Sequence, residues 1–98
     1  MSTIQTSSAL RVARVDLTTT DNTTLYTVPN RYDSIVESII VSEDSGNADT
    51  ITVTITDAAS AVFNLFKVKA ISANGTVELL SRDLLLTAGD ILKVQAAT

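Results

Sequence analysis

Eleven Asp and Glu residues carry most of the acid–base chemistry that this sequence offers, because the chain contains no His and no Cys. Without these two residue types it lacks the usual general base, the thiol nucleophile and the ordinary ligands of zinc. A pair of carboxylates can act as acid and base, and Glu37 is the carboxylate in the least expected place, between Ile35 and Ile39. Isolated charges are rarely buried unpaired. We therefore expect Glu37 to be exposed or paired with an Arg, and we predict no catalytic residue and no enzyme.

A second candidate site is the acidic loop Glu43-Asp44-Ser45-Gly46-Asn47-Ala48-Asp49. Calcium binds clustered oxygen ligands, and the calcium loop of an EF-hand closes with a Glu at its last position. In a loop that starts at Glu43 this position is Thr54, which does not match the pattern. The composition of the loop is typical of a solvated turn, and we predict no metal site and no cofactor.

Length and composition set the class of the fold. A chain of 98 residues fits a single domain, here residues 1–98. Its content of 45% hydrophobic and 18% charged residues is typical of a globular protein. Thr, Val and Ile dominate the apolar runs, and these residue types favour strands. The sequence therefore predicts an all-β protein.

The clearest strand is Thr50–Asp57, where Ile and Val alternate with Thr, as in a strand with one buried and one solvated face. In the next run, Val62–Ser72, the apolar phase slips, which indicates a β-bulge or a two-faced strand. Asn74-Gly75 is typical of a type I′ hairpin turn, with positive φ at both residues. It should pair the preceding strand with Thr76–Ser81.

The stretch Asp33–Glu43 has apolar residues on both faces of a predicted strand. Ile35, Ile39 and Val41 would point one way and Val36 and Ile40 the other. Such a strand belongs in the middle of a sheet or beneath an interface rather than at an edge. The sequence does not say whether one subunit buries both faces or whether another subunit completes the burial.

The remaining runs are short and are separated by turn signals. Together they predict about seven or eight strands in an antiparallel β-sandwich or jelly-roll-like fold, with a flexible N-terminal arm over residues 1–20. These runs are Leu10–Leu17 (a strand or a short helix), Leu25–Val28 (ended by Pro29), Leu84–Leu86 and Ile91–Gln95.

Charge and hydropathy restrict the partners. The net charge is −4 and the seven Lys and Arg form no cluster, so we expect no binding to nucleic acid. No apolar run approaches the ~20 residues that cross a bilayer, and residues 1–8 lack the pattern of a signal peptide. We expect the protein to be made in the cytosol and to stay there, or to leave it inside a larger assembly.

Three segments, in order, carry a family resemblance: Thr24–Pro29, Ile35–Ser42 and Leu84–Val94, the last containing Ala-Gly-Asp-x-Leu-x-Val. This order of strands and turns resembles small β-sandwich virion proteins of tailed bacteriophages, over roughly residues 24–96. The resemblance implies a capsid decoration (cement) protein that binds at junctions between major capsid subunits and stabilises the phage head. It implies as partners the major capsid protein and the chain itself, as a homotrimer. The expected location is the capsid exterior of a virion assembled in the host cytoplasm.

Two alternatives remain. The first is a neck, tail or fibre-associated module of the same sandwich type, which copy number in the virion would separate from a cement protein. The second is a carbohydrate-binding sandwich, although sugar sites usually present aromatic faces and this chain has four aromatic residues, two of them Phe.

Overall fold

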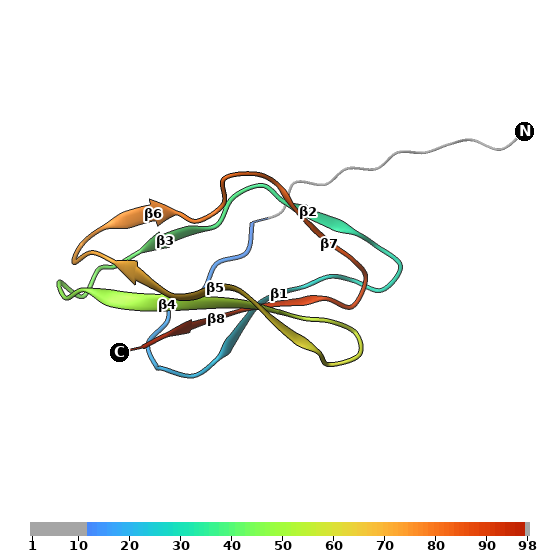
Figure 1. The fold of residues 1–98 in the computed structure, drawn as a ribbon, viewed down its shortest axis with the longest axis horizontal. Helices are drawn as coiled ribbons and strands as arrows, with labels where there is room; N and C mark the ends of the chain where they lie inside the picture. The colour runs from blue at the N-terminus through green and yellow to red at the C-terminus, as the bar shows by residue number, and fades with distance from the viewer. Residues whose placement is uncertain (1–11, 98) are drawn as a thin grey trace, which may run out of the picture.

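The computed structural model describes residues 12–97, and these residues form an antiparallel, all-β fold without a helix (Figure 1). This confirms the predicted class, and the strand count lies within the predicted range. The strands are β1 (Thr23–Thr27), β2 (Ser34–Val36), β3 (Ile40–Ser42), β4 (Asp49–Thr56), β5 (Val62–Ile71), β6 (Thr76–Glu78), β7 (Leu84–Leu86) and β8 (Ile91–Ala96).

The strands lie in two layers, as in a sandwich. One layer is a four-stranded sheet in the order β1-β8-β4-β5. The other consists of two short antiparallel pairs, β2 with β7 and β3 with β6, which lie one after the other above the sheet in Figure 1. We call this second layer the ribbon; it comprises residues 34–42 and 76–86.

The ribbon contains the stretch that was predicted as one two-faced strand, and this prediction is wrong in two respects. Residues 33–43 form two three-residue strands, β2 and β3, separated at residues 37–39. Each pairs with one neighbour only, so neither is the middle strand of a sheet. Ile39 is buried, whereas Ile35 is 63% exposed, and the two side chains do not share a face. The alternation therefore slips at the interruption.

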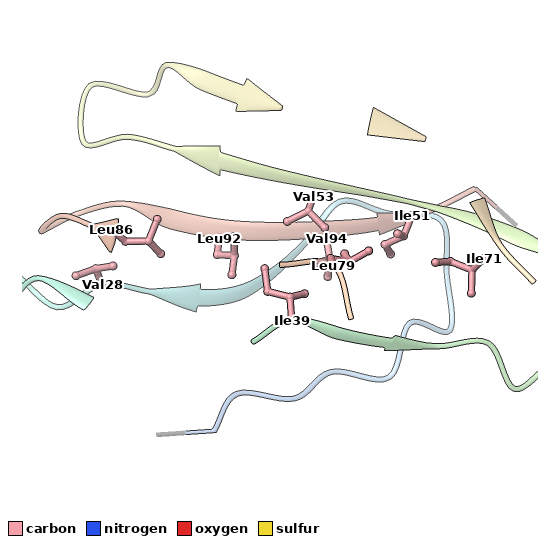
Figure 2. Packing of buried hydrophobic residues seen from close by; sticks show 9 residues of the cluster. All are labelled: Val28, Ile39, Ile51, Val53, Ile71, Leu79, Leu86, Leu92 and Val94. Atoms are coloured by element: carbon pink, nitrogen blue, oxygen red, sulfur yellow. The ribbon is translucent and has the colours of Figure 1, made fainter. Parts of the chain in front are cut away.

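The core lies between the two layers. The sheet contributes Ile51, Val53, Ile71, Leu92 and Val94, and the ribbon contributes Ile39, Leu79 and Leu86, with Val28 following β1 (Figure 2). Burial of each such side chain contributes about 1.5–3 kcal/mol relative to an exposed position. Because the side chains come from every part of residues 28–94, neither layer has a core of its own.

β4 carries the predicted alternation and positions the centre of the sheet. Ile51 and Val53 are buried, as predicted, and pair with β8 on one side and β5 on the other. The Thr face is less solvated than expected: Thr54 is only 7% exposed. This happens because β4 has neighbours on both sides, whose side chains cover its outer face.

β5 is an edge strand, and the predicted irregularity is present as two register shifts against β4. Ile51 pairs with Lys69 and Val53 with Phe66, so two residues of β5 oppose the single residue Thr52. One of the two is Val68, which has a φ of 54° and donates its amide to Thr52 Oγ1 at 3.1 Å. Positive φ is rare for a β-branched residue, and here it marks the bulge.

The turn at Asn74-Gly75 differs from the predicted hairpin. Asn74 has a φ of 55° but Gly75 does not have positive φ, so the turn is not type I′. The strand that follows, β6, pairs with β3 in the ribbon and not with β5. The turn thus carries the chain from the sheet to the ribbon. Gly75 is required for space, because a Cβ there would lie 2.9 Å from the carbonyl oxygen of Ser72.

The segment before β1 is neither strand nor helix over residues 12–18, which overturns the expectation of a strand or short helix up to Leu17. Leu17 packs against the core, and the Gln95 side chain donates a hydrogen bond of 2.9 Å to the carbonyl oxygen of Thr20. These contacts attach residues 17–20 to the sandwich. Of the rest of the predicted arm, residues 12–16 are exposed and residues 1–11 lie outside the described residues.

Candidate interaction surfaces

Glu37 lies in the interruption between β2 and β3 and is exposed. The apolar face on which it was predicted does not exist, since Ile35 and Ile39 point to opposite sides. The position of Glu37 instead adds negative charge to the outer side of the ribbon.

Glu78 is the carboxylate with a defined structural role. Its side chain accepts hydrogen bonds from the Ser38 hydroxyl, from the backbone amide of Ile39 at 3.0 Å and from that of Leu80 at 3.3 Å. The Ser38 hydroxyl, which makes the strongest of these contributions, and then the two amides hold the pKa of Glu78 below its usual range. Glu78 therefore bridges the two chains of the ribbon where the β-ladder is interrupted.

The acidic loop after β3 is ordered by its own side chains. The Glu43 carboxylate accepts hydrogen bonds from the amide and hydroxyl of Ser45, and the Asp49 carboxylate accepts one from the amide of Thr50 at 2.7 Å. Within residues 12–97 no three acidic side chains gather in a group that would hold a metal ion. The geometry of this loop is that of a turn that leads into β4.

The described part of the chain has shallow surface hollows, of which two are the best defined. One lies at the start of β4 and the end of β5, and the other lies on the outer face of the sheet beside Gln95. Their linings contain a single ionisable side chain, that of Asp49. Neither hollow combines an acid with a base or a nucleophile, so neither provides the arrangement that general acid–base or covalent catalysis requires.

The most distinctive feature of β5 is the apolar surface that it exposes. Phe63 is 56% exposed, and Val62 and Val68 are exposed to a similar extent. Lys67 and Lys69 lie on the same strand and are also exposed. We call these five residues together the β5 surface, and they lie on both sides of the sheet. Phe63 and Lys69 pair with Ile55 and Ile51, whereas Val62 pairs with Thr56 and both Lys67 and Val68 oppose Thr52. In Figure 1 the start of β5 and the turn before it lie on the side of the sheet away from the ribbon.

A second apolar surface lies on the outer side of the ribbon. Ile35 and Leu85 are cross-strand partners, and each is 63% exposed. Ile40, paired with Glu78, is exposed as well. The acidic residues of the ribbon are exposed and lie at the interruption between β2 and β3 or beside it. We call the whole set the ribbon surface; its members are Ile35, Glu37, Ile40, Glu78, Asp83 and Leu85.

The sequence contained a signal for one of these surfaces. Residues 33–43 have apolar side chains on both faces of the predicted strand, which is expected of a central strand or of a strand beneath an interface. Ile35 and Ile40 are the residues that carry the second of these signals. The β5 surface was missed, because the slipped apolar phase at Phe63 and Phe66 was interpreted as a β-bulge or a two-faced strand and not as the exposed residues of an edge strand. A pattern of apolar residues does not show that β5 is an edge strand.

The fold and surfaces define the class of the protein, a small antiparallel β-sandwich with exposed apolar surfaces on both layers. No protein-family model, curated protein or solved structure matches this chain. The described residues include no helix with the length and hydropathy that a membrane crossing requires.

Proposed function

We propose that this chain is a structural subunit of a tailed-phage virion, a capsid decoration (cement) protein that binds at junctions between major capsid subunits and stabilises the head. The observation that carries the proposal is the presence of exposed apolar side chains in both layers of the sandwich. Contiguous exposed apolar areas are typical of sites where proteins bind one another. The resemblance of three segments to phage virion proteins supplies the kind of assembly.

A cement protein needs a rigid scaffold and surfaces that match its neighbours rather than an active site. The two-layer core supplies the scaffold, since its buried residues come from both layers. The β5 surface and the ribbon surface supply two areas of contact, so one subunit can bind more than one neighbour at a junction.

The test is binding to expanded capsids of the phage that encodes the chain, prepared without it. The purified protein is added, unbound protein is removed by sedimentation, and the copies per particle are counted by quantitative mass spectrometry. Hundreds of copies, with increased resistance of the particle to heat, are the expected result. Binding of about a dozen copies at one vertex would identify a neck or tail component instead. No binding would overturn the proposal.

A further inference from the structure

Asn74 and Gly75 lie in the turn, residues 72–75, that carries the chain from β5 in the sheet to β6 in the ribbon. Asn74 is exposed, and it is the one Asn of the sequence that precedes a Gly. In an Asn-Gly sequence the backbone nitrogen of the Gly can attack the side-chain amide carbon of the Asn, because Gly has no side chain that hinders the approach. The pair is therefore a candidate site of deamidation.

The reaction needs water and no other reactant. The nitrogen of Gly75 loses its proton and forms a bond to Cγ of Asn74, while the bond from Cγ to Nδ2 breaks, so that ammonia leaves and a cyclic succinimide remains. Water then opens the ring. Attack at one carbonyl gives Asp, and attack at the other gives isoaspartate, in which the main chain runs through the former side-chain Cβ and is longer by one carbon.

The native turn holds Gly75 at both of its backbone polar groups. Its amide donates to the carbonyl oxygen of Ser72 at 2.9 Å, and its carbonyl oxygen accepts the amide of Glu43 at 2.8 Å. The nitrogen of a succinimide carries no hydrogen, so ring closure removes the donor of the first bond. Space is restricted as well, because a Cβ on Gly75 would lie 2.9 Å from the same Ser72 oxygen. The closed turn therefore opposes the reaction, and ring closure requires local opening.

The same turn attaches the ribbon to the sheet. Glu43 directly follows β3, and beside it the hydroxyls of Ser42 and Thr76 lie 3.0 Å apart across the β3–β6 ladder. An isoaspartate at residue 74 lengthens the main chain in front of this ladder, which displaces the Gly75 carbonyl from the Glu43 amide. It also adds a negative charge close to Glu43, and like charges repel. Both changes weaken the pairing of β6 with β3.

We propose that Asn74 is a deamidation site controlled by the fold. It is protected while the turn is closed on β3, it reacts when the turn opens, and the isoaspartate that forms then keeps β6 from pairing with β3 as before. The modification is thus an irreversible record of opening between the two layers. It does not depend on the proposed function.

The first experiment compares the rate of deamidation at mildly alkaline pH in the native protein and in urea that unfolds it. The tryptic peptide 70–82 contains Asn74 and no other Asn, and mass spectrometry follows its conversion. The rate in urea is expected to exceed the native rate at least tenfold, which corresponds to an opening free energy of at least about 1.4 kcal/mol. Asn47, in the exposed loop before β4, is the internal reference, and its rate should change less.

Ser42→Ala tests the link to the ribbon, because it removes the hydroxyl contact with Thr76 and leaves residues 72–75 unchanged. Native deamidation of Asn74 should become about threefold faster, the expected effect of losing one exposed hydrogen bond. Ser81→Ala removes an exposed hydroxyl elsewhere in the ribbon. It is the matched control, and its Asn74 should deamidate at the wild-type rate.

The second experiment measures hydrogen exchange at residues 39–45 in the isoaspartate form, purified by ion exchange. Freshly prepared Asn74→Asp is the matched control, since it adds the charge without lengthening the main chain. Exchange of the Glu43 amide is expected to be fastest in the isoaspartate form and close to the wild-type rate in Asn74→Asp.

Three results would overturn the proposal. Equal rates of deamidation in native protein and in urea would refute protection by the turn. An Asn74 that stays intact in urea would refute the modification site itself. Wild-type hydrogen exchange in the isoaspartate form would refute the effect on the ribbon. None of these results bears on capsid binding, which tests the proposed function separately.

Discussion

Thr54 looks like a solvated residue in the sequence, but in the structure its buried hydroxyl lowers the stability of the fold. Its neighbours in the alternation, Thr52 and Thr56, are half-buried, but Thr54 is 7% exposed at the centre of the sheet, where it pairs with both Asn64 and Lys93. Its hydroxyl is buried and has no hydrogen-bond partner. A buried hydroxyl without a partner loses its interaction with water and gains nothing in return.

Replacing Thr54 by Val, which has nearly the same shape, is expected to stabilise the fold by about 1 kcal/mol, because it removes a desolvated polar group. The measurement is the free energy of unfolding from urea titration. Thr52→Val is the matched control on the same face: its Oγ1 accepts the amide of Val68 at 3.1 Å, so its loss is expected to destabilise the fold by a similar amount. Equal effects of the two substitutions would contradict this account of Thr54.

At the scale of elements, the sequence predicted best those features that depend only on the residues of one strand. The alternation of Thr50–Asp57 corresponds to β4, and the slipped phase after Val62 corresponds to the register shifts of β5. The prediction failed where the pairing of two strands depends on segments that are distant in the sequence. The residues around Asn74-Gly75 do not indicate that β6 pairs with β3. Residues 33–43 do not indicate that the strands they form, β2 and β3, lie outside the four-stranded sheet.

The interruption of the ribbon explains why a continuous strand was the wrong prediction. At residues 37–39 the β-ladder stops, and the side chain of Glu78 takes over hydrogen bonds with the backbone amides of Ile39 and Leu80. The amide of Leu79 donates to the carbonyl oxygen of Ile39 at 2.8 Å. A carboxylate that replaces ladder bonds has no signature in hydrophobic periodicity, so Glu78 was not among the candidate residues.

Protonation of Glu78 should therefore weaken the ribbon. The pKa of Glu78 in the folded protein lies below the value of 4.5 that the group has without these contacts. Its contribution to stability is thus fully present above that value and is lost as the pH falls through the folded pKa, because the unfolded state binds the proton more tightly. Glu78→Gln should lower the melting temperature at neutral pH and flatten its decrease between about pH 6 and about pH 3.

Glu37→Gln is the control for this measurement, since it removes an exposed carboxylate from the same ribbon and leaves the hydrogen bonds of Glu78 intact. A Glu78→Gln variant whose melting temperature follows the wild-type pH profile in parallel would show that the carboxylate does not stabilise the interruption.

At the scale of the whole molecule, the sandwich consists of one shared core and an exposed apolar surface on each layer. The layers are joined by residues such as Leu86 and Val53, which are fully buried, while the sheet edge and the outer side of the ribbon expose apolar groups of the same kind. Neither surface contributes side chains to the core, so substitutions there, other than at Glu78, should leave the core packing intact. The sequence thus predicted the all-β class of the fold, but it gave a signal for the ribbon surface only, because exposure of β5 depends on which strand lies at the edge of the sheet.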